Sequence, residues 1–425
     1  FDEAHQLVEA GVQFLGTQLS TGAAIDVARD ALALGLRHAR GLKAWHDLCG
    51  ELDRAARELR LVCAGPLREV RGVIKLAWLE RAADDALHEP LVALANAALT
   101  VADAIAGVAE TAPEWPKLDE RARHLAALAN AFEGESPSGH VRWIDISPQQ
   151  ARLVQAPLDI REMLSEQRNA SPKAWIFTSA TLGDDEALSW FCAPTGLEGA
   201  AKLRVGSPFD YPAHARLYVP ARFPKPNEAA HPSAVGALAA RCALALGGRT
   251  FVLTTTLRVL PVIAQAMREA AEQAGCELTL LVQGTESRRT LLQRFADGRG
   301  AVLIGSQSFW EGIDVPGDAL QCVLIDKLPF PPPNDPLVQA RIKQLREQGR
   351  DPFAEYFVAE AAVSLKQGGG RLIRTESDRG LLVICDPRMR QMPYGRRLRA
   401  ALPPMGVLDD EAMALAWLDE LAAAH

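Results

Sequence analysis

The chain opens with Phe1-Asp2-Glu3-Ala4-His5, in which an apolar residue is followed directly by two carboxylates. An Asp-Glu pair in this position is typical of a buried strand that ends at a nucleotide site. In phosphoryl transfer the first carboxylate, Asp2, would hold Mg²⁺ through water, and Glu3 would orient or deprotonate the attacking water. The alternative is a solvated acidic helix start, and these five residues alone do not decide between the two.

A second stretch, Ser179-Ala180-Thr181, follows an apolar run at 175–178 that we expect to be a buried strand. Small hydroxyl side chains at a strand tip can connect the acid pair to a second surface through hydrogen bonds. The alternative is an ordinary cap at the end of the strand. The later stretches have to decide.

The most specific stretch is Gln367-Gly368-Gly369-Gly370-Arg371-Leu372-Ile373-Arg374. Its two arginines are three residues apart, so we expect them on one face of a helix, where both can reach a triphosphate. Their planar, permanently charged guanidinium groups suit the charge on a transferred phosphoryl group, and Gly370 would let the helix approach its neighbours closely. A solvated basic helix end is the alternative, and the position of the octet just before the last expected strand of the sheet favours the functional interpretation.

In this order the stretches resemble the motifs of superfamily 2 helicases, specifically the iron–sulfur branch of the DinG/YoaA and XPD type. The resemblance implies that Asp2 binds Mg²⁺ through water and that Glu3 activates the attacking water. It implies that the γ-phosphate of ATP is sensed by His5, Gln367, Arg371 and Arg374, with Gly370 beside them. Ser179, Ala180 and Thr181 would couple the nucleotide site to the DNA-binding surface.

Two further stretches carry expectations from the same resemblance. In the loop at 305–317, the positions that bind nucleotide and couple it to DNA are matched by Glu311, Gly312 and Asp314. Thr254 and Thr256, with Arg258, match the motif that contacts the phosphate backbone of single-stranded DNA, although a threonine triplet at a strand end is equally a helix cap. Eight arginines between 371 and 399, against three carboxylates, add modestly to the DNA interpretation.

The expected fold is α/β. Residues 206–425 alternate between strands and helices and predict a RecA-like helicase lobe, a parallel sheet with helices on both faces. Its five strands are expected at 250–253, 278–282, 301–305, 322–326 and 381–385, after a linker that ends near residue 231. Residues 13–170 show helical spacing and predict an all-α arch-type insertion, closed by two strands at 141–146 and 152–156. Residues 1–12 and 171–205 would be the remnant of the first RecA-like lobe.

The resemblance implies ATP and Mg²⁺ as ligands and a [4Fe-4S] cluster in the parent protein, with its cysteines ahead of the acid pair. The seven cysteines of this chain form no short ligand spacing. No Gly-Lys dipeptide occurs, so the phosphate-binding loop G-x-x-x-x-G-K-[ST] is not in the sequence. We therefore expect a fragment that starts inside a domain, and our hypothesis is that it does not hydrolyse ATP although its parent does.

Partners and location follow from composition and from the resemblance. The net charge of −7 argues against a generally basic nucleic-acid coat, and the sequence lacks a run of eighteen apolar residues, so no membrane span is expected. The resemblance implies 5′-to-3′ movement on single-stranded DNA, a cytoplasmic location and a clamp-loader partner, a subunit of the DNA polymerase III chi type. The rival hypothesis is a non-catalytic DNA-binding scaffold derived from a helicase. A dinucleotide-binding enzyme would need G-x-G-x-x-G after a strand, which is not found.

Overall fold

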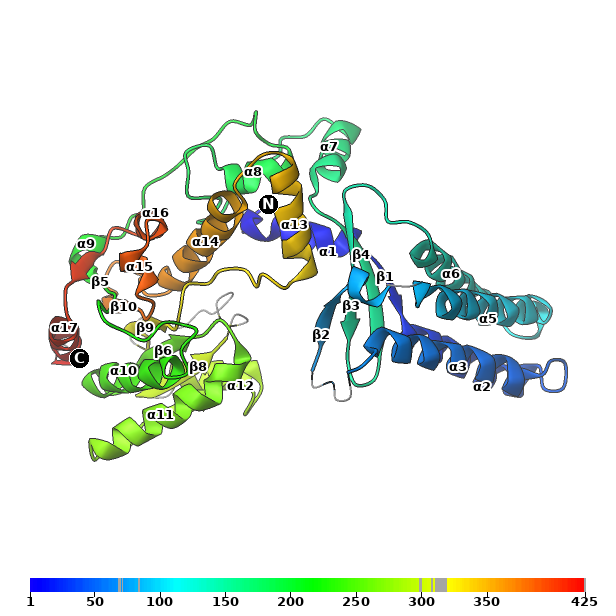
Figure 1. Ribbon diagram of the computed structural model, residues 1–425, viewed down its shortest axis with the longest axis horizontal. Helices are drawn as coiled ribbons and strands as arrows, with labels where there is room; N and C mark the ends of the chain where they lie inside the picture. The colour runs from blue at the N-terminus through cyan, green and yellow to red at the C-terminus, as the bar shows by residue number, and fades with distance from the viewer. Residues whose placement is uncertain are drawn as a thin grey trace.

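The computed structural model describes residues 1–67, 70, 72–82, 85–297, 300–306, 309 and 319–423. The chain has three parts, a small N-terminal unit, an elongated insertion and a larger α/β lobe (Figure 1). The insertion extends to one side of the molecule, and the N-terminus lies between it and the lobe.

The α/β lobe is built on a seven-stranded sheet of order β11-β5-β10-β9-β6-β8-β7, and every pair in it is parallel. The strands are β5 (Ala215–Tyr218), β6 (Thr250–Leu253), β7 (Thr279–Val282), β8 (Ala301–Gly305), β9 (Cys322–Ile325), β10 (Gly380–Ile384) and β11 (Gly406–Leu408). The four central strands β6, β8, β9 and β10 are buried throughout, as near-continuous apolar runs in a parallel sheet require.

Helices cover both faces of this sheet. One face packs against α10 (His231–Leu246), α11 (Leu260–Gln273) and α17 (Glu411–Ala423). The other packs against α12 (Arg288–Asp297), α14 (Val358–Gly369) and α16 (Tyr394–Ala401). The predicted RecA-like architecture is confirmed.

All five predicted strands of the lobe exist, but the sheet has two more at one edge. β5 begins at Ala215, inside the segment expected to be a linker, and the short helix α9 (Tyr211–His214) precedes it. β5 contains an arginine and β11 has only three residues, so neither carries the apolar pattern of the strands that were predicted. The linker prediction is therefore wrong over this part.

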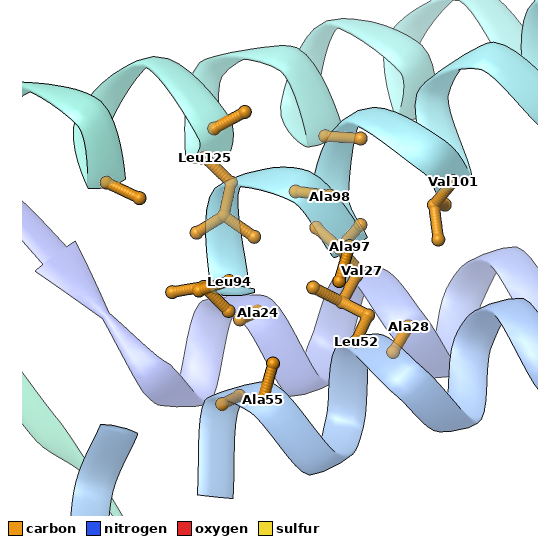
Figure 2. Close-up of a cluster of buried hydrophobic side chains, with 14 of the residues drawn as sticks. Ala24, Val27, Ala28, Leu52, Ala55, Leu94, Ala97, Ala98, Val101 and Leu125 are labelled. Carbon is orange, nitrogen blue, oxygen red and sulfur yellow. The ribbon is translucent and has the colours of Figure 1, made fainter. Parts of the chain in front are cut away.

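The insertion contains four long helices and a sheet. The helices are α2 (Thr21–His38), α3 (Trp45–Ala64), α5 (His88–Ala106) and α6 (Trp115–Glu133). They pack through alanine, leucine and valine side chains, which Figure 2 shows meeting between the helices at Ala24, Val27, Leu52, Leu94 and Leu125. The many buried alanines let the helix backbones approach one another closely.

An antiparallel sheet of order β1-β4-β3-β2 closes the base of the insertion. Its strands are β1 (Thr17–Ser20), β2 (Ile74–Ala77), β3 (His140–Ile146) and β4 (Ala151–Pro157). The pair β3–β4 was predicted, whereas β1 and β2 were not, because each has four residues of which only one is buried. The insertion is thus not all-helical, which corrects that part of the prediction.

Helix α5 is long and apolar enough, by length and composition, to cross a membrane. Leu91, Leu94, Val101 and Ile105 of this helix are buried in the core of the insertion. A core helix of a folded domain has the same composition.

The N-terminal unit joins residues from both sides of the insertion. It contains η1 (Ala4–Gln6), α1 (Leu7–Leu15), α7 (Arg161–Ala170) and α8 (Ser189–Thr195). The run at 175–178 is extended and pairs with the first residues, since Phe1 N donates to Ile176 O at 2.7 Å and Ala4 N to Thr178 O at 2.9 Å. It is not a buried strand, as Ile176 is 68% exposed and Phe1 is 59% exposed.

The remaining elements are α13, a helix as long as α14, and several short turns. They are α4 (Trp78–Arg81), η3 (Ala109–Thr111), η4 (Leu257–Val259), α13 (Pro336–Glu347), the π-helical turn η7 (Phe353–Phe357) and α15 (Arg388–Gln391).

Candidate functional site

The acid pair and the Ser-Ala-Thr stretch lie against each other. His5 Nδ1 lies 2.9 Å from Ser179 Oγ and 3.1 Å from Glu3 Oε2. Ser179 Oγ lies 3.4 Å from the same Glu3 oxygen. The Glu3 carboxylate therefore contacts two side chains, His5 and Ser179, which are 174 residues apart in the sequence.

The contacts continue from Ser179 into the α/β lobe. Thr181 N donates to Ser179 Oγ at 3.1 Å, and Gln367 Nε2 donates to Thr181 Oγ1 at 3.3 Å. Thr181 is 3% exposed, so its hydroxyl is used inside the protein. The hydrogen-bonded series Glu3–His5–Ser179–Thr181–Gln367, which we call the relay, joins the N-terminal unit to helix α14.

Asp2 differs from Glu3 in its surroundings. Its Oδ1 accepts hydrogen bonds from Thr178 Oγ1 and from Glu3 N, both at 3.0 Å. The bond from Thr178, and then the one from the backbone, lower the pKa of Asp2 below its usual value. An exposed, ionised carboxylate of this kind fits Mg²⁺, which takes oxygen ligands and keeps several of its waters.

Glu3 adopts a left-handed backbone conformation, with φ of 49° and ψ of 41°. For a residue with a Cβ atom this costs about 1 kcal/mol. The conformation ends the extended segment and starts η1. The acid pair is thus at a turn, not at the end of a buried strand as predicted.

The two arginines of the Gln-to-Arg octet do not lie on a helix. Helix α14 ends at Gly369, and Arg371 and Arg374 follow in the turn that leads to β10. Asp378 holds this turn, because its Oδ2 accepts from Arg374 N at 2.7 Å and from Thr375 N at 2.9 Å. The predicted shared helix face is wrong, whereas Gln367 does lie on the last turn of α14.

The close approach predicted for Gly370 belongs to its neighbour. A Cβ atom on Gly369 would lie 3.1 Å from Leu382 Cδ2 and 3.3 Å from Leu402 Cδ2, whereas one on Gly370 would first meet the carbonyl of Lys366. Gly369 therefore allows α14 to pack on β10.

The threonine triplet lies at the end of β6. Thr254 is buried, and its hydroxyl donates to Thr256 O at 3.1 Å, so it serves the local backbone. Thr256 and Arg258 are exposed. Of the three residues predicted to contact DNA, these two are accessible to solvent.

A buried carboxylate supports this strand end. Asp326 Oδ1 accepts from Thr255 N at 3.1 Å and from Lys327 N at 2.8 Å. Burial raises the pKa of Asp326 to about 7. No role was predicted for Asp326, because an aspartate directly after a buried strand is also common in an ordinary turn.

A cleft of about 1500 Å³ brings the three parts together. His5 and Glu9 line it from the N-terminal unit, Lys75 from the insertion, and Thr256 and Gln367 from the α/β lobe. Besides carboxylates such as Asp159, Glu355 and Glu360, its wall contains lysine, arginine and aromatic side chains. These include Lys225, Lys327, Phe330, Arg341, Tyr356, Arg388 and Arg397.

Two ion pairs across the parts were not predicted. Arg397 of α16 binds Asp184, and Lys75 of β2 binds Asp335 at 2.8 Å. The partners are separated by 213 and 260 residues, and no sequence pattern links positions so far apart.

Some predicted residues cannot be placed. Glu311, Gly312 and Asp314 lie outside the described residues. Within the described residues, no three His, Cys, Asp or Glu side chains are grouped so as to hold a metal ion. The seven cysteines are all free thiols.

A parallel sheet with helices on both faces is the architecture of a RecA-like lobe. Residues 240–405 match the family model of the helicase C-terminal domain. The chain as a whole is similar to helicases of the DinG/YoaA type.

Individual relatives support this assignment. The chain is 34% identical to the ATP-dependent DNA helicase YoaA of Escherichia coli K12, over 98% of this chain and 64% of that protein. It is 37% identical to the ATP-dependent helicase DinG of Mycobacterium tuberculosis H37Ra, over 72% of this chain and 46% of that protein. The chain thus spans less than two thirds of the length of these relatives.

The fold is also similar to that of a solved structure. The structure of S. tokodaii Xpd4 superimposes with a TM-score of 0.60 at 16% identity, and the match covers 96% of this chain and 75% of that one. At this identity the likeness concerns the fold alone.

Proposed function

We propose that this chain supplies the second motor lobe, the coupling segment and the insertion of an ATP-dependent DNA helicase that moves 5′ to 3′ along single-stranded DNA. The observation that carries the proposal is the relay. It joins an acid pair to a glutamine on the opposite lobe, and a motor that uses ATP needs a connection of this kind between its nucleotide site and its moving parts.

The side chains of the relay have distinct tasks in this proposal. Glu3, oriented by His5 and Ser179, takes a proton from the attacking water or orients that water. Asp2, ionised and exposed, holds Mg²⁺ through water, and the ion would neutralise charge on the phosphates. Gln367, Arg371 and Arg374 approach the γ-phosphate from the second lobe.

Binding of single-stranded DNA is assigned to the cleft. Thr256 and Arg258 lie at or near its α/β side and suit phosphate oxygens. Phe330, Tyr356 and the arginines of the wall suit bases and phosphates. Work on DNA implies a cytoplasmic location.

The expected clamp-loader partner stays a prediction. The acidic C-terminal helix α17 packs Ala414, Leu418 and Leu421 against the lobe. The helix is thus part of the folded lobe.

The test is DNA-stimulated ATP hydrolysis by the protein expressed from its complete reading frame, with this chain assayed beside it. Gln367→Ala and Thr181→Val should each lower the DNA-stimulated rate at least tenfold while leaving ATP-independent DNA binding within about twofold. The matched control is Gln265→Ala, because Gln265 is exposed and its side-chain amide donates to Glu269 on the surface of α11.

Two outcomes would count against the proposal. Hydrolysis unaffected by either relay variant would remove the role of the relay. DNA binding without hydrolysis in the complete protein would leave the rival, a non-catalytic scaffold derived from a helicase. Hydrolysis by this chain itself would contradict the hypothesis that it needs the phosphate-binding loop.

A further inference from the structure

A second contact between the N-terminal unit and the α/β lobe, here called the two lobes, lies beside the relay. Arg397 donates from Nε to Asp184 Oδ2 at 2.5 Å and from Nη2 to Asp184 Oδ1 at 3.0 Å. This is the two-pronged geometry in which arginine–carboxylate pairs are strongest. The Asp184 side chain is 7% exposed and that of Arg397 is 40% exposed, so the carboxylate is nearly covered while the guanidinium still reaches solvent.

Asp184 stands on a segment that is fixed to the N-terminal unit. It lies three residues after Thr181 of the relay. Arg204 donates to the carbonyls of Gly183 and Asp185 on either side of it, at 3.3 and 2.6 Å. Asp185 Oδ1 in turn accepts from Ser189 N at 2.8 Å and holds the start of α8.

Arg397 stands on an element fixed to the α/β lobe. Its Nη1 also donates to Ala354 O at 2.5 Å, which orients the guanidinium. Helix α16 buries Leu398 in the same core cluster as α14, the helix that carries Gln367. A Cβ atom on Gly395 would lie 2.1 Å from Met389 O, so α16 also sits close against α15.

The two cross-lobe contacts therefore join the same two bodies. Residues 181–184 lie on one side and α14 with α16 on the other. If the lobes separate, Gln367–Thr181 and Arg397–Asp184 must break together. The first is one hydrogen bond between uncharged groups, and the second is a charged pair with two hydrogen bonds, so the ion pair contributes more to holding the lobes together.

We propose that Arg397 and Asp184 form a positioning pair that sets the closed distance between the lobes and thereby places Gln367 and its neighbouring arginines at the γ-phosphate. The pair touches neither ATP nor the reacting water, and its role in the reaction rests on the function proposed above. Other charged groups near Arg397 are Asp185 and Glu355, and neither accepts the two-pronged bond.

A distance measurement tests the pair without requiring hydrolysis. Cys276 is the one exposed cysteine of the chain and accepts a spin label on the α/β lobe. Glu166→Cys, at an exposed position of α7, provides the second label on the N-terminal unit. In this doubly labelled protein Arg397→Ala and Asp184→Asn should each broaden a single distance distribution toward longer distances. The exchanged pair Asp184→Arg with Arg397→Asp should restore it.

The matched control is Arg399→Ala, an exposed arginine on the same helix, which should leave the distribution unchanged. An unchanged distribution in both single variants would overturn the proposed pair. Circular dichroism of each variant separates lobe opening from loss of fold.

A kinetic measurement then tests the consequence in the protein from its complete reading frame. Each single variant should raise KM for ATP by about tenfold, with a smaller effect on kcat, and the exchanged pair should recover most of the loss. A broadened distribution with an unchanged KM would overturn the positioning role. If the unaltered protein shows no DNA-stimulated hydrolysis, the proposed function fails, while the distance result still decides whether the pair holds the lobes.

Discussion

Replacing Arg142 with methionine is expected to destabilise the insertion by about 2–4 kcal/mol. Arg142 lies on β3 and is buried. Its guanidinium donates to the carbonyls of Ala131, Phe132, Gly134 and Glu135 and to Gln155 Oε1, at distances between 2.6 and 3.2 Å. It thus binds the carbonyls at the C-terminal end of α6, which have no partner within the helix.

The magnitude follows from which carbonyls can reach water. Ala131, Gly134 and Glu135 are exposed residues, so their carbonyls can be hydrated, at a net loss of about 0.5–1 kcal/mol each. Phe132 is buried, and its orphaned carbonyl costs about 1–3 kcal/mol. Methionine keeps apolar contact with Trp78 and Phe132, whose rings lie 5.3 Å from the guanidinium carbon, and it avoids the burial of a charge, which offsets part of the loss.

Hydrogen exchange followed by mass spectrometry measures this locally. Peptides from α6 and from β3–β4 should exchange about thirtyfold to about a thousandfold faster in Arg142→Met, since 1.4 kcal/mol corresponds to a factor of ten. The control is Arg123→Met, in which an arginine of α6 loses only surface pairs with Asp119 and Asp103. Exchange within threefold of the unaltered protein, or equal effects of the two substitutions, would refute the reasoning.

Three further predictions concern stability. The pKa of Asp326 is about 7 in the folded protein against a usual 3.8, so the folded state binds more protons and stability should fall as pH rises from about 4 to about 7; Asp326→Asn should flatten this part of the Tm–pH curve, and an unchanged curve would contradict the assignment. Gly35→Ala places a Cβ atom 2.3 Å from Trp45 Cδ2 and should cost about 1–3 kcal/mol in a denaturation experiment, whereas Gly50→Ala, which meets no atom within 4 Å, should be neutral or stabilising. Lys75→Ala removes a partly exposed ion pair with the α/β lobe and should change stability by less than about 1 kcal/mol; a larger loss would mean that this pair anchors the insertion.

The sequence predicted the sheet where local pattern and burial coincide. β6 and β8 begin and end at the predicted residues, because each is an apolar run of four or five residues bounded by turns. β2 and β11 are as short but carry polar or exposed positions. They are strands because a partner lies beside them, and partners are not visible in a local window.

The site was predicted as residue types and not as geometry. All members of the relay, which are Glu3, His5, Ser179, Thr181 and Gln367, were identified from the sequence, and the structure brings them together. Helical spacing suggested that Arg371 and Arg374 share a face, but three consecutive glycines end α14 before them. Glycine is a weak helix former, so the glycines themselves were the signal for that end.

The α/β lobe contacts the N-terminal unit and the insertion in different ways. The N-terminal unit and the α/β lobe are joined by the relay and by the Arg397–Asp184 pair, in which the carboxylate is nearly buried. A charged contact between the insertion and the α/β lobe is Lys75–Asp335, whose carboxylate is 20% exposed against 7% for Asp184, and a single partly exposed pair is worth about 1 kcal/mol or less. Asp335 also caps the start of α13, because its other oxygen accepts from Leu337 N. Leu337 of the same helix also packs against the apolar cluster that contains Trp143 and Val154 of the insertion. Separating the insertion from the α/β lobe must therefore break this apolar contact as well as the ion pair, so we expect the cost to exceed that of the ion pair alone.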